Sequence, residues 1–282
     1  MDPLTFETPG KINLYLKVEG RRADGWHDLL TVFYPVPGMS DRITLRFGGE
    51  GMRVVCDAPG VPLDRGNLAV KAVEGYYAAA GGKVPSVEIR IEKHLPVAGG
   101  MGGGSSDAGA VLRLLQAAEG KLTSEQLARV ALEIGSDVPF FLNPVSSVGR
   151  GRGELLTPVD LPFDLPLLLV PGCFPVSAGW AFRHWSPDGK NSGPEELIDR
   201  LQTRDFSAAG DLLRNDLEPA VLRKFPLLSM IADEFRRTGG APLMSGSGPT
   251  MFALYPDPVL RDRACVELGP VFVPHRIPLL SV

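Results

Sequence analysis

The 282-residue chain has few cysteines and histidines and no long apolar run. Its three cysteines, Cys56, Cys173 and Cys265, lie far apart, which excludes a disulfide framework and a zinc site of the CxxC type. This cysteine usage favours a reducing, cytoplasmic compartment. The most apolar stretch, residues 165–170, contains Pro166 and is much too short to cross a bilayer.

An excess of basic charge is also missing, because the formal net charge is −4. Nucleic-acid-binding surfaces carry the opposite sign, so we expect neither a nucleic acid nor a membrane as a partner. The first residues, MDPLTFETPGK, lack the basic and apolar regions of a signal peptide. Proline and glycine, by contrast, are abundant and spread along the chain, which predicts many turns.

Hydrophobic periodicity predicts a mixed fold. Strict alternation over residues 11–18 (KINLYLKV) predicts a strand with Lys11 and Asn13 on its polar face. Further strands are expected at residues 29–36, 41–47, 52–56, 86–92, 161–171 and 251–255. A capping box of Thr123 with Gln126 predicts a helix that ends near residue 135, and further helices are expected at residues 67–80, 107–119, 177–185, 205–214 and 226–238. Strands and helices mix without strict alternation, which indicates the α+β class.

The most informative stretch is residues 96–106, which read PVAGGMGGGSS and precede a helical pattern. Glycine lets backbone N–H groups curve around a bulky anion, and the N-terminus of a helix adds further donors. The P-loop pattern fails because Ser105 occupies the lysine position, and the Rossmann pattern fails because Ser105 also replaces a required glycine. Taken alone, the stretch predicts either a phosphate-binding loop or a flexible loop with helix-capping serines.

This loop, with its Ser-Ser pair before an alanine-containing helix, resembles the nucleotide loop of the GHMP kinases, which include galactokinase and the homoserine, mevalonate and phosphomevalonate kinases. Further stretches resemble, in the same order, the members that act on a cytidine diphosphate derivative of methylerythritol in non-mevalonate isoprenoid synthesis: residues 9–13, 20–29, 67–68, 93–106, 135–141, 215–218 and 245–248. The resemblance implies a two-domain α+β fold. It has a ribosomal-protein-S5-domain-2-like N-terminal domain at residues 1–156, a ferredoxin-like C-terminal domain at residues 157–282, and an active site between them.

The resemblance implies transfer of a phosphoryl group from ATP, with Mg²⁺, to an alcohol. Asp137 matches the catalytic base of the family and Lys11 matches its catalytic cation. A lysine on that strand could orient the substrate hydroxyl and steady the developing charge. The residues alone predict that Asp137 caps a turn after a helix and that Lys11 is a solvated lysine on a strand.

Acceptor recognition is expected at Asn13, Trp26 and His27. By resemblance, His27 hydrogen-bonds the cytosine edge and Trp26 stacks on its face, where the family more often has tyrosine. A second aromatic is expected at Phe182, with Trp180 as a rival. The second glycine loop is expected to border the substrate diphosphate and comprises Ser245, Gly246, Ser247 and Gly248. The residues alone predict only a hairpin turn around Trp26, with that ring in the core, and a tight turn for the second loop.

ATP is placed by the same resemblance on Asn67, Lys93 and the first loop, whose residues are Pro96, Val97, Ala98, Gly99, Gly100, Met101, Gly102, Gly103, Gly104, Ser105 and Ser106. No carboxylate cluster identifies magnesium ligands, and a monomer or homodimer is expected. One rival is a GHMP kinase for a mevalonate-type or sugar substrate, against which residues 24–27 (DGWH) speak. Another is a catalytically silent nucleotide-binding relative, against which the presence of both Lys11 and Asp137 speaks.

Overall fold

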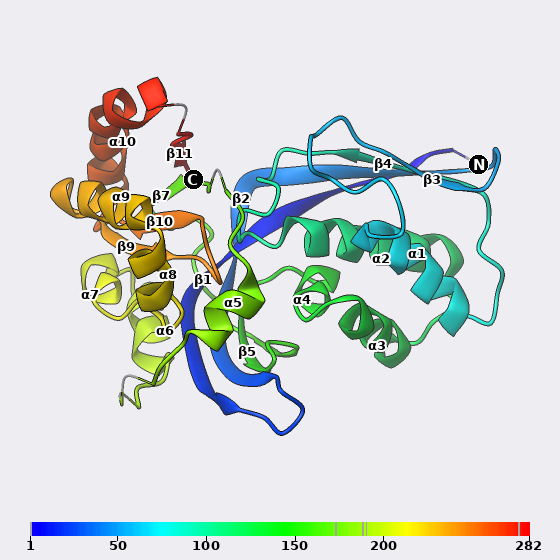
Figure 1. Cartoon of the computed structure of the whole chain (residues 1–282), viewed down its shortest axis with the longest axis horizontal. Coiled ribbons are helices and arrows are strands. Elements are labelled where there is room, and N and C mark those ends of the chain that lie inside the picture. The colour runs from blue at the N-terminus through cyan, green and yellow to red at the C-terminus, as the bar shows by residue number, and fades with distance from the viewer. Residues whose placement is uncertain (1, 173, 188, 190, 276) are drawn as a thin grey trace. The chain divides into compact units, whose positions relative to one another are not determined.

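The computed structural model describes residues 2–172, 174–187, 189, 191–275 and 277–282. The chain divides into two compact units. Unit 1 contains residues 1–10, 38–97 and 102–144, and unit 2 contains residues 11–37, 98–101 and 145–282. Strands β1 (Leu4–Arg21) and β2 (His27–Phe47) therefore contribute residues to both units. Helices and strands mix along the chain, so the α+β class is confirmed (Figure 1).

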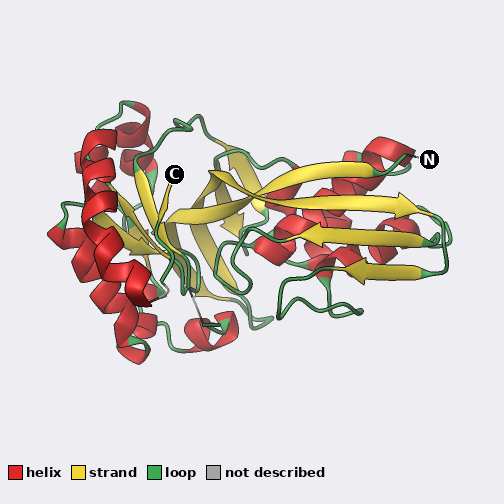
Figure 2. Cartoon of the chain, turned by 90° about the horizontal axis from the view of Figure 1, so that it is seen from above, coloured by secondary structure: helices red, strands yellow, loops and turns green. Residues whose placement is uncertain are grey.

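In unit 1 a sheet carries helices on one face. Strand β4 (Val87–Glu92) pairs antiparallel with the 42–47 part of β2 and parallel with β3 (Met52–Val55). Alternate residues such as Ile43, Leu45 and Ile89 are fully buried against the helices. Figure 2 shows those helices on one side of the strands only. They are α1 (Leu68–Ala79), α2 (Gly103–Glu119), α3 (Ser124–Ile134) and α4 (Val138–Leu142).

Unit 2 is built on an antiparallel sheet in the order β11-β7-β10-β9. These strands are β7 (Leu167–Val170), β9 (Ala241–Met244), β10 (Met251–Leu254) and β11 (Leu280–Ser281). Its helices are α5 (Ala178–Arg183), α6 (Glu195–Gln202), α7 (Phe206–Gly210), α8 (Glu218–Lys224), α9 (Pro226–Arg237) and α10 (Pro258–Phe272), followed by the 3₁₀ turn η1 (Val273–His275). Across the described part of the chain, no helix is long and apolar enough to span a membrane.

The strands of unit 2 that surround Lys11 come from three parts of the sequence. Strand β8 (Arg214–Asn215) runs parallel to β1 and places Asn215 opposite Leu16. Strand β5 (Ser147–Gly151) pairs with residues 29–33 of β2 and forms a hairpin with β6 (Leu155–Pro158). The predicted strand at residues 11–18 is confirmed, but its Lys11 and Asn13 face is buried too, with exposures of 4% and 2%.

Four predicted elements need correction. The strands expected at residues 29–36 and 41–47 are one strand, β2, because the backbone stays extended through Pro35 and Pro37. The strand expected at residues 161–171 shortens to β7, since its flanking prolines cannot donate to a ladder. The helix expected at residues 205–214 ends at Gly210, and the chain then pairs with β1 as β8. Cys56 and Cys265 are free thiols, whereas Cys173 lies outside the described residues.

Candidate active site

The first glycine loop leads directly into helix α2, which begins at Gly103 rather than at the predicted Asp107. Gly102 is the N-cap and has left-handed backbone with φ 72°, a conformation that glycine adopts without strain. Ser105 and Ser106 therefore lie in the first turn, and their prediction as N-caps was wrong. The first amides of an α-helix have no partner inside it, so this turn presents N–H donors suited to a phosphate.

Ser106 anchors this helix to β1 within unit 1. Its hydroxyl lies 2.7 Å from Oγ1 of Thr8 and donates over 2.7 Å to the carbonyl of Pro9, and the side chain is fully buried. These contacts explain the early start of α2, because they stabilise a glycine-rich turn whose intrinsic helix propensity is poor. The predicted nucleotide contact of Ser106 remains a prediction, and its amide donates inside the helix to the carbonyl of Gly102 over 2.8 Å.

Lys93 lies beneath the first turn of α2, where two carboxylates hold it. Its ammonium donates to Asp41 and, over 3.1 Å, to Oδ2 of Asp107, and none of the three side chains is more than 5% exposed. Burial raises the pKa of Asp107 to about 7, against the opposing effect of Lys93. Burial lowers the pKa of Lys93, but Asp107 and Asp41 outweigh it and raise that pKa. A Cβ at Gly103 would lie 3.1 Å from Nζ of Lys93, so the ammonium closely underlies the loop backbone.

Asn67, the other predicted contact to ATP, is the N-cap of α1. Its Oδ1 accepts the amide of Ala69 over 2.9 Å, and its Nδ2 donates to the carbonyl of Pro62 over 2.7 Å. The side chain is 6% exposed. Its local role is thus to begin a helix, and its predicted role at the nucleotide stays a prediction.

Lys11 is oriented by a chain of hydrogen bonds inside unit 2. Its ammonium donates over 2.7 Å to Oδ1 of Asn13, whose Nδ2 donates over 2.8 Å to Oγ1 of Thr31. That hydroxyl donates in turn to the carbonyl of Tyr15 over 2.7 Å. The ring of Phe33 lies 5.4 Å from the Lys11 ammonium and adds a cation–π contact. Lys11 is therefore a buried cation of fixed direction, which is what a group that stabilises developing charge requires.

Asp137 is the N-cap residue of α4 in unit 1. Its side chain is half-buried and makes no capping hydrogen bond to α4. Two buried aromatic rings, Phe140 and Phe141, follow it on α4 and fix the helix in the core. Lys11 and Asp137 belong to different compact units, and their action as a pair stays a prediction.

An aromatic cluster in unit 2 brings together two of the predicted acceptor-binding residues, His27 and Phe182. The imidazole of His27 stacks on Phe182, with ring centroids 5.1 Å apart, and meets Trp185 edge-on at 5.9 Å. Burial, together with Arg21, lowers the pKa of His27, which favours the neutral ring. Trp26 is 52% exposed, so the expectation of a core tryptophan was wrong.

The guanidinium of Arg152 lies 4.6 Å from the exposed ring of Trp26.

The two candidate aromatics of α5, Trp180 and Phe182, have different neighbours. Trp180 instead stacks on His184 at 4.2 Å and faces Lys224. The structure therefore puts Phe182, and not Trp180, beside His27. Trp185 and Arg152 were missed by the sequence reasoning, because nothing in their local pattern distinguishes them.

The second glycine loop packs against the first within unit 2. The hydroxyl of Ser245 donates over 3.2 Å to the carbonyl of Gly100. A Cβ at Gly100 would lie 2.6 Å from the carbonyl oxygen of Gly248, so no side chain fits between the loops. Gly246 faces the lysine: a Cβ there would lie 3.4 Å from Nζ of Lys11. The backbone of this loop is therefore next to the ammonium of Lys11.

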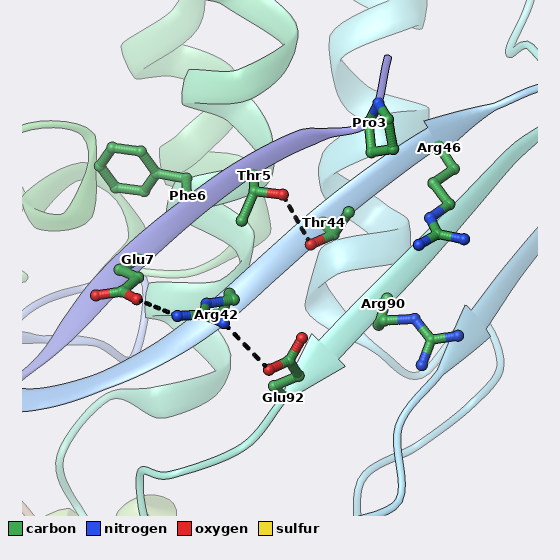
Figure 3. Close-up of a pocket in the computed structure, with 9 residues that line it drawn as sticks. All are labelled: Pro3, Thr5, Phe6, Glu7, Arg42, Thr44, Arg46, Arg90 and Glu92. Atoms are coloured by element: carbon green, nitrogen blue, oxygen red, sulfur yellow. Dashed lines mark hydrogen bonds and ion pairs between the residues drawn. The ribbon is translucent and has the colours of Figure 1, made fainter. Parts of the chain in front are cut away.

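A hollow of about 440 Å³ on the helix-free face of the unit 1 sheet holds none of the predicted site residues (Figure 3). Its floor is formed by Thr5 and Thr44, whose hydroxyls lie 3.0 Å apart. Arg42 pairs with Glu7 at 2.8 Å and with Glu92 at 3.7 Å. The long charged side chains around short threonines account for the hollow.

No group of three histidines, cysteines or carboxylates within the described residues is placed to hold a metal ion. Magnesium commonly keeps several waters and binds through one or two carboxylates and the phosphates of a nucleotide.

Family models match both parts of the chain. The model for the GHMP kinases N terminal domain matches residues 67–143, and that for GHMP kinases C terminal matches residues 197–270. A crystal structure of homoserine kinase from Cytophaga hutchinsonii is 18% identical, covers 100% of this chain and 94% of its own, and superposes with a TM-score of 0.76. That likeness concerns the fold alone. Fold and family models together define the class as GHMP kinase, as the sequence resemblance implied.

Closer relatives narrow the class. The 4-diphosphocytidyl-2-C-methyl-D-erythritol kinase of Anaeromyxobacter dehalogenans (strain 2CP-C) is 43% identical over 254 residues, which are 88% of this chain and 79% of that protein. The protein of that name from Streptomyces coelicolor is 38% identical over 265 residues, 90% of this chain and 88% of its own. A crystal structure of 4-(cytidine 5'-diphospho)-2C-methyl-D-erythritol kinase is 33% identical with a TM-score of 0.80, covering 98% and 97% of the two chains. The chain belongs to the 4-diphosphocytidyl-2-C-methyl-D-erythritol kinase family.

Proposed function

We propose that this protein transfers the γ-phosphoryl group of ATP to the 2-hydroxyl of 4-diphosphocytidyl-2-C-methyl-D-erythritol, a step of the non-mevalonate isoprenoid pathway. The observation that carries the proposal is the His27–Phe182 stack, in the same unit as the oriented Lys11. An aromatic ring with a neutral imidazole suits a flat base that offers hydrogen-bonding edges. Identity of 43% with a relative of that name over most of the chain supports the same acceptor.

Each proposed group has one task in the transfer. Asp137 accepts the proton of the acceptor hydroxyl, the resulting oxygen attacks the γ-phosphorus, and ADP leaves. Lys11 stabilises the negative charge that develops at the reacting atoms. The amides of the first loop and of the first turn of α2 hold the nucleotide phosphates. Magnesium, when bound with ATP, would neutralise phosphate charge.

The remaining assignments belong to the same proposal. We place ATP on Asn67, Lys93 and residues 96–106, and the acceptor on Asn13, Trp26, His27, Phe182 and residues 245–248. The N-terminal domain is placed at residues 1–156 and the C-terminal domain at residues 157–282. The scattered cysteines support work in the cytoplasm.

A competition among acceptors tests the proposal. Purified protein with ATP and Mg²⁺ is offered 4-diphosphocytidyl-2-C-methyl-D-erythritol, mevalonate or galactose, and ADP release is followed with ³¹P NMR of the product. We expect turnover of the cytidyl acceptor alone, with phosphate on its 2-hydroxyl. Release of ADP only with mevalonate or galactose would refute the acceptor assignment, and binding of ATP without any turnover would favour a catalytically silent relative.

A further inference from the structure

We propose that Asn215 is a positioning residue that holds the second glycine loop, residues 245–248, so that its free amides face the charge that Lys11 stabilises. The inference rests on the proposed function, whose assignments give Asn215 no role. Asn215 is 5% exposed and lies on β8, directly beside the strand that carries Lys11 and Asn13. Its position is fixed by parallel pairing, since the amide of Asp216 donates to the carbonyl of Leu16 over 2.9 Å.

The side-chain amide of Asn215 donates both of its N–H groups to backbone carbonyls in and just before the loop. Its Nδ2 donates over 2.6 Å to the carbonyl of Met244 and over 2.7 Å to the carbonyl of Gly246. Its Oδ1 accepts the amide of Leu217 over 2.9 Å, which fixes the orientation of the side chain. A primary amide has two donors to give. Asparagine is thus matched to two carbonyls, one at the end of β9 and one in the second glycine loop.

These bonds determine where the loop amides point. A peptide group is planar and trans, so the N–H of Ser247 points away from the Gly246 carbonyl that Asn215 holds. The amides of Ser245 and Gly248 are used inside the loop, donating to Thr250 and Ser245 over 2.9 Å each. Within the described residues no hydrogen bond engages the amide of Gly246 or that of Ser247. Two donors thus stay available next to Lys11.

The loop needs such an external hold. Gly246 and Gly248 have positive φ, 57° and 82°, and glycine gives up more conformational freedom on ordering than any other residue. A second side chain, that of Glu218, accepts the amide of Met244 over 3.1 Å just before the loop. Asp216 accepts the amide of Val18 over 2.9 Å and so ties the same segment to β1. Residues 215–218 therefore fix strand and loop as one body.

The chemistry favours an anionic ligand for the two amides. Preorganised backbone donors beside a buried cation form a cradle for the oxygens of a phosphate, either the acceptor diphosphate or the transferred phosphoryl group. If Asn215 is removed, the loop amides lose their fixed direction while Lys11 and Asn13 keep theirs. We therefore expect a loss in kcat that exceeds any change in KM for ATP.

The test compares Asn215→Ala with Thr238→Val, a control that removes buried hydrogen bonds of the same unit to Phe235 and Tyr255, away from both loops. With the cytidyl acceptor and ATP we expect kcat to fall about 100-fold in Asn215→Ala, as when one preorganised donor is lost from an enzyme, with KM for ATP within about threefold. Asn215→Asp, which keeps the shape but presents oxygen to both carbonyls, should be similarly impaired. Thr238→Val should keep the wild-type kcat, although its melting temperature should be comparable to that of Asn215→Ala.

Hydrogen exchange gives a readout that does not depend on turnover. The amides of Ser245 and Gly248 should exchange faster in Asn215→Ala than in the wild type, and should keep their protection in Thr238→Val. Unchanged kcat in Asn215→Ala, or unchanged exchange of these two amides, would overturn the positioning role. A wild-type protein that does not phosphorylate the cytidyl acceptor would refute the proposed function instead, and the exchange result would still decide the role of Asn215 in ordering the loop.

Discussion

At the scale of single residues, the site depends on neutral side chains that orient charged ones. Lys11 is fixed through Asn13 and Thr31, and neither of these two carries charge. These hydrogen bonds give the ammonium a fixed direction, which a group that stabilises an anionic transition state requires. The alternating pattern of residues 11–18 predicted that Lys11 and Asn13 share a face, but it could not predict Thr31, which lies on the next strand.

The hydroxyl of Thr31 can be tested by replacement with valine. Thr31→Val leaves Nδ2 of Asn13 without its acceptor, so the amide can turn away from Lys11. We expect kcat to fall about tenfold, equivalent to about 1.4 kcal/mol, with KM for ATP unchanged. Thr44→Val on the same strand, whose hydroxyl contacts only that of Thr5 within the described residues, serves as the control. Equal kcat values for the two variants would contradict the orienting role.

Glu218 makes stability depend on pH. Burial raises its pKa from 4.5 to about 7, so the folded protein holds the proton more tightly than the unfolded chain. The contribution of Glu218 is therefore most favourable below pH 4.5 and is lost as the pH rises toward 7. Glu218→Gln keeps an acceptor for Met244 and removes this titration. We expect the variant to gain stability over the wild type by up to roughly 3 kcal/mol between pH 4.5 and pH 8.

Urea unfolding at several pH values measures this difference. Asp107, whose pKa is also raised to about 7, contributes in the same direction in both proteins and cancels in the comparison. A stability difference between Glu218→Gln and wild type that does not change with pH would contradict the assignment.

At the scale of elements, helix α2 begins at the turn that we propose to bind phosphate, and it packs against α4, whose N-cap residue is Asp137. Gly109 lies where α2 contacts α4, and a Cβ at this position would be 2.5 Å from Cβ of Phe141 on α4. Glycine is in general a weak helix former. The structure gives the reason for Gly109, since glycine allows α2 and α4 to approach closely. The N-cap residue of α4 is Asp137, so this packing also sets the position of the proposed base.

A matched pair of glycine substitutions tests this contact. Gly109→Ala should destabilise the protein by about 2 kcal/mol and lower kcat, because α4 must shift to admit the methyl group. Gly20→Ala in β1, where a Cβ would meet no atom within 4 Å apart from the chain neighbours, should be neutral or stabilising by up to about 1 kcal/mol. Thermal unfolding and kcat are measured for both. Stabilisation by Gly109→Ala would show that the helices are not in close contact.

Local patterns predicted those elements whose stability is local. The capping box of Thr123 with Gln126 is present, and helix α1 begins after Asn67 as expected. The start of α2 was missed because its stabilising contacts, from Ser106 to Thr8 and Pro9, are made by residues far apart in sequence. Strand β8 was missed for the same reason, since two residues cannot show a period. Asn215 lay within a matched stretch, but its partners in the second loop become visible only in three dimensions.

At the scale of the whole molecule, the two compact units are interleaved in sequence, and β1 passes from one to the other between Gly10 and Lys11. The proposed mechanism takes Lys11 from unit 2 and Asp137 from unit 1. The hydrophobic periodicity of a single sequence cannot show that segments of two units alternate along the chain. The resemblance to GHMP kinases supplied the class of protein. Only that class predicts that Lys11 and Asp137 act together as a catalytic pair.

The most direct measurement of the central claim is phosphoryl transfer by Asp137→Asn. Asparagine keeps the size of the side chain and removes the base, so we expect kcat with the cytidyl acceptor to fall by at least about 100-fold. The dissociation constant for ATP, measured by calorimetry on the same sample, should stay within about threefold of wild type. Turnover at a wild-type rate in Asp137→Asn would contradict the account.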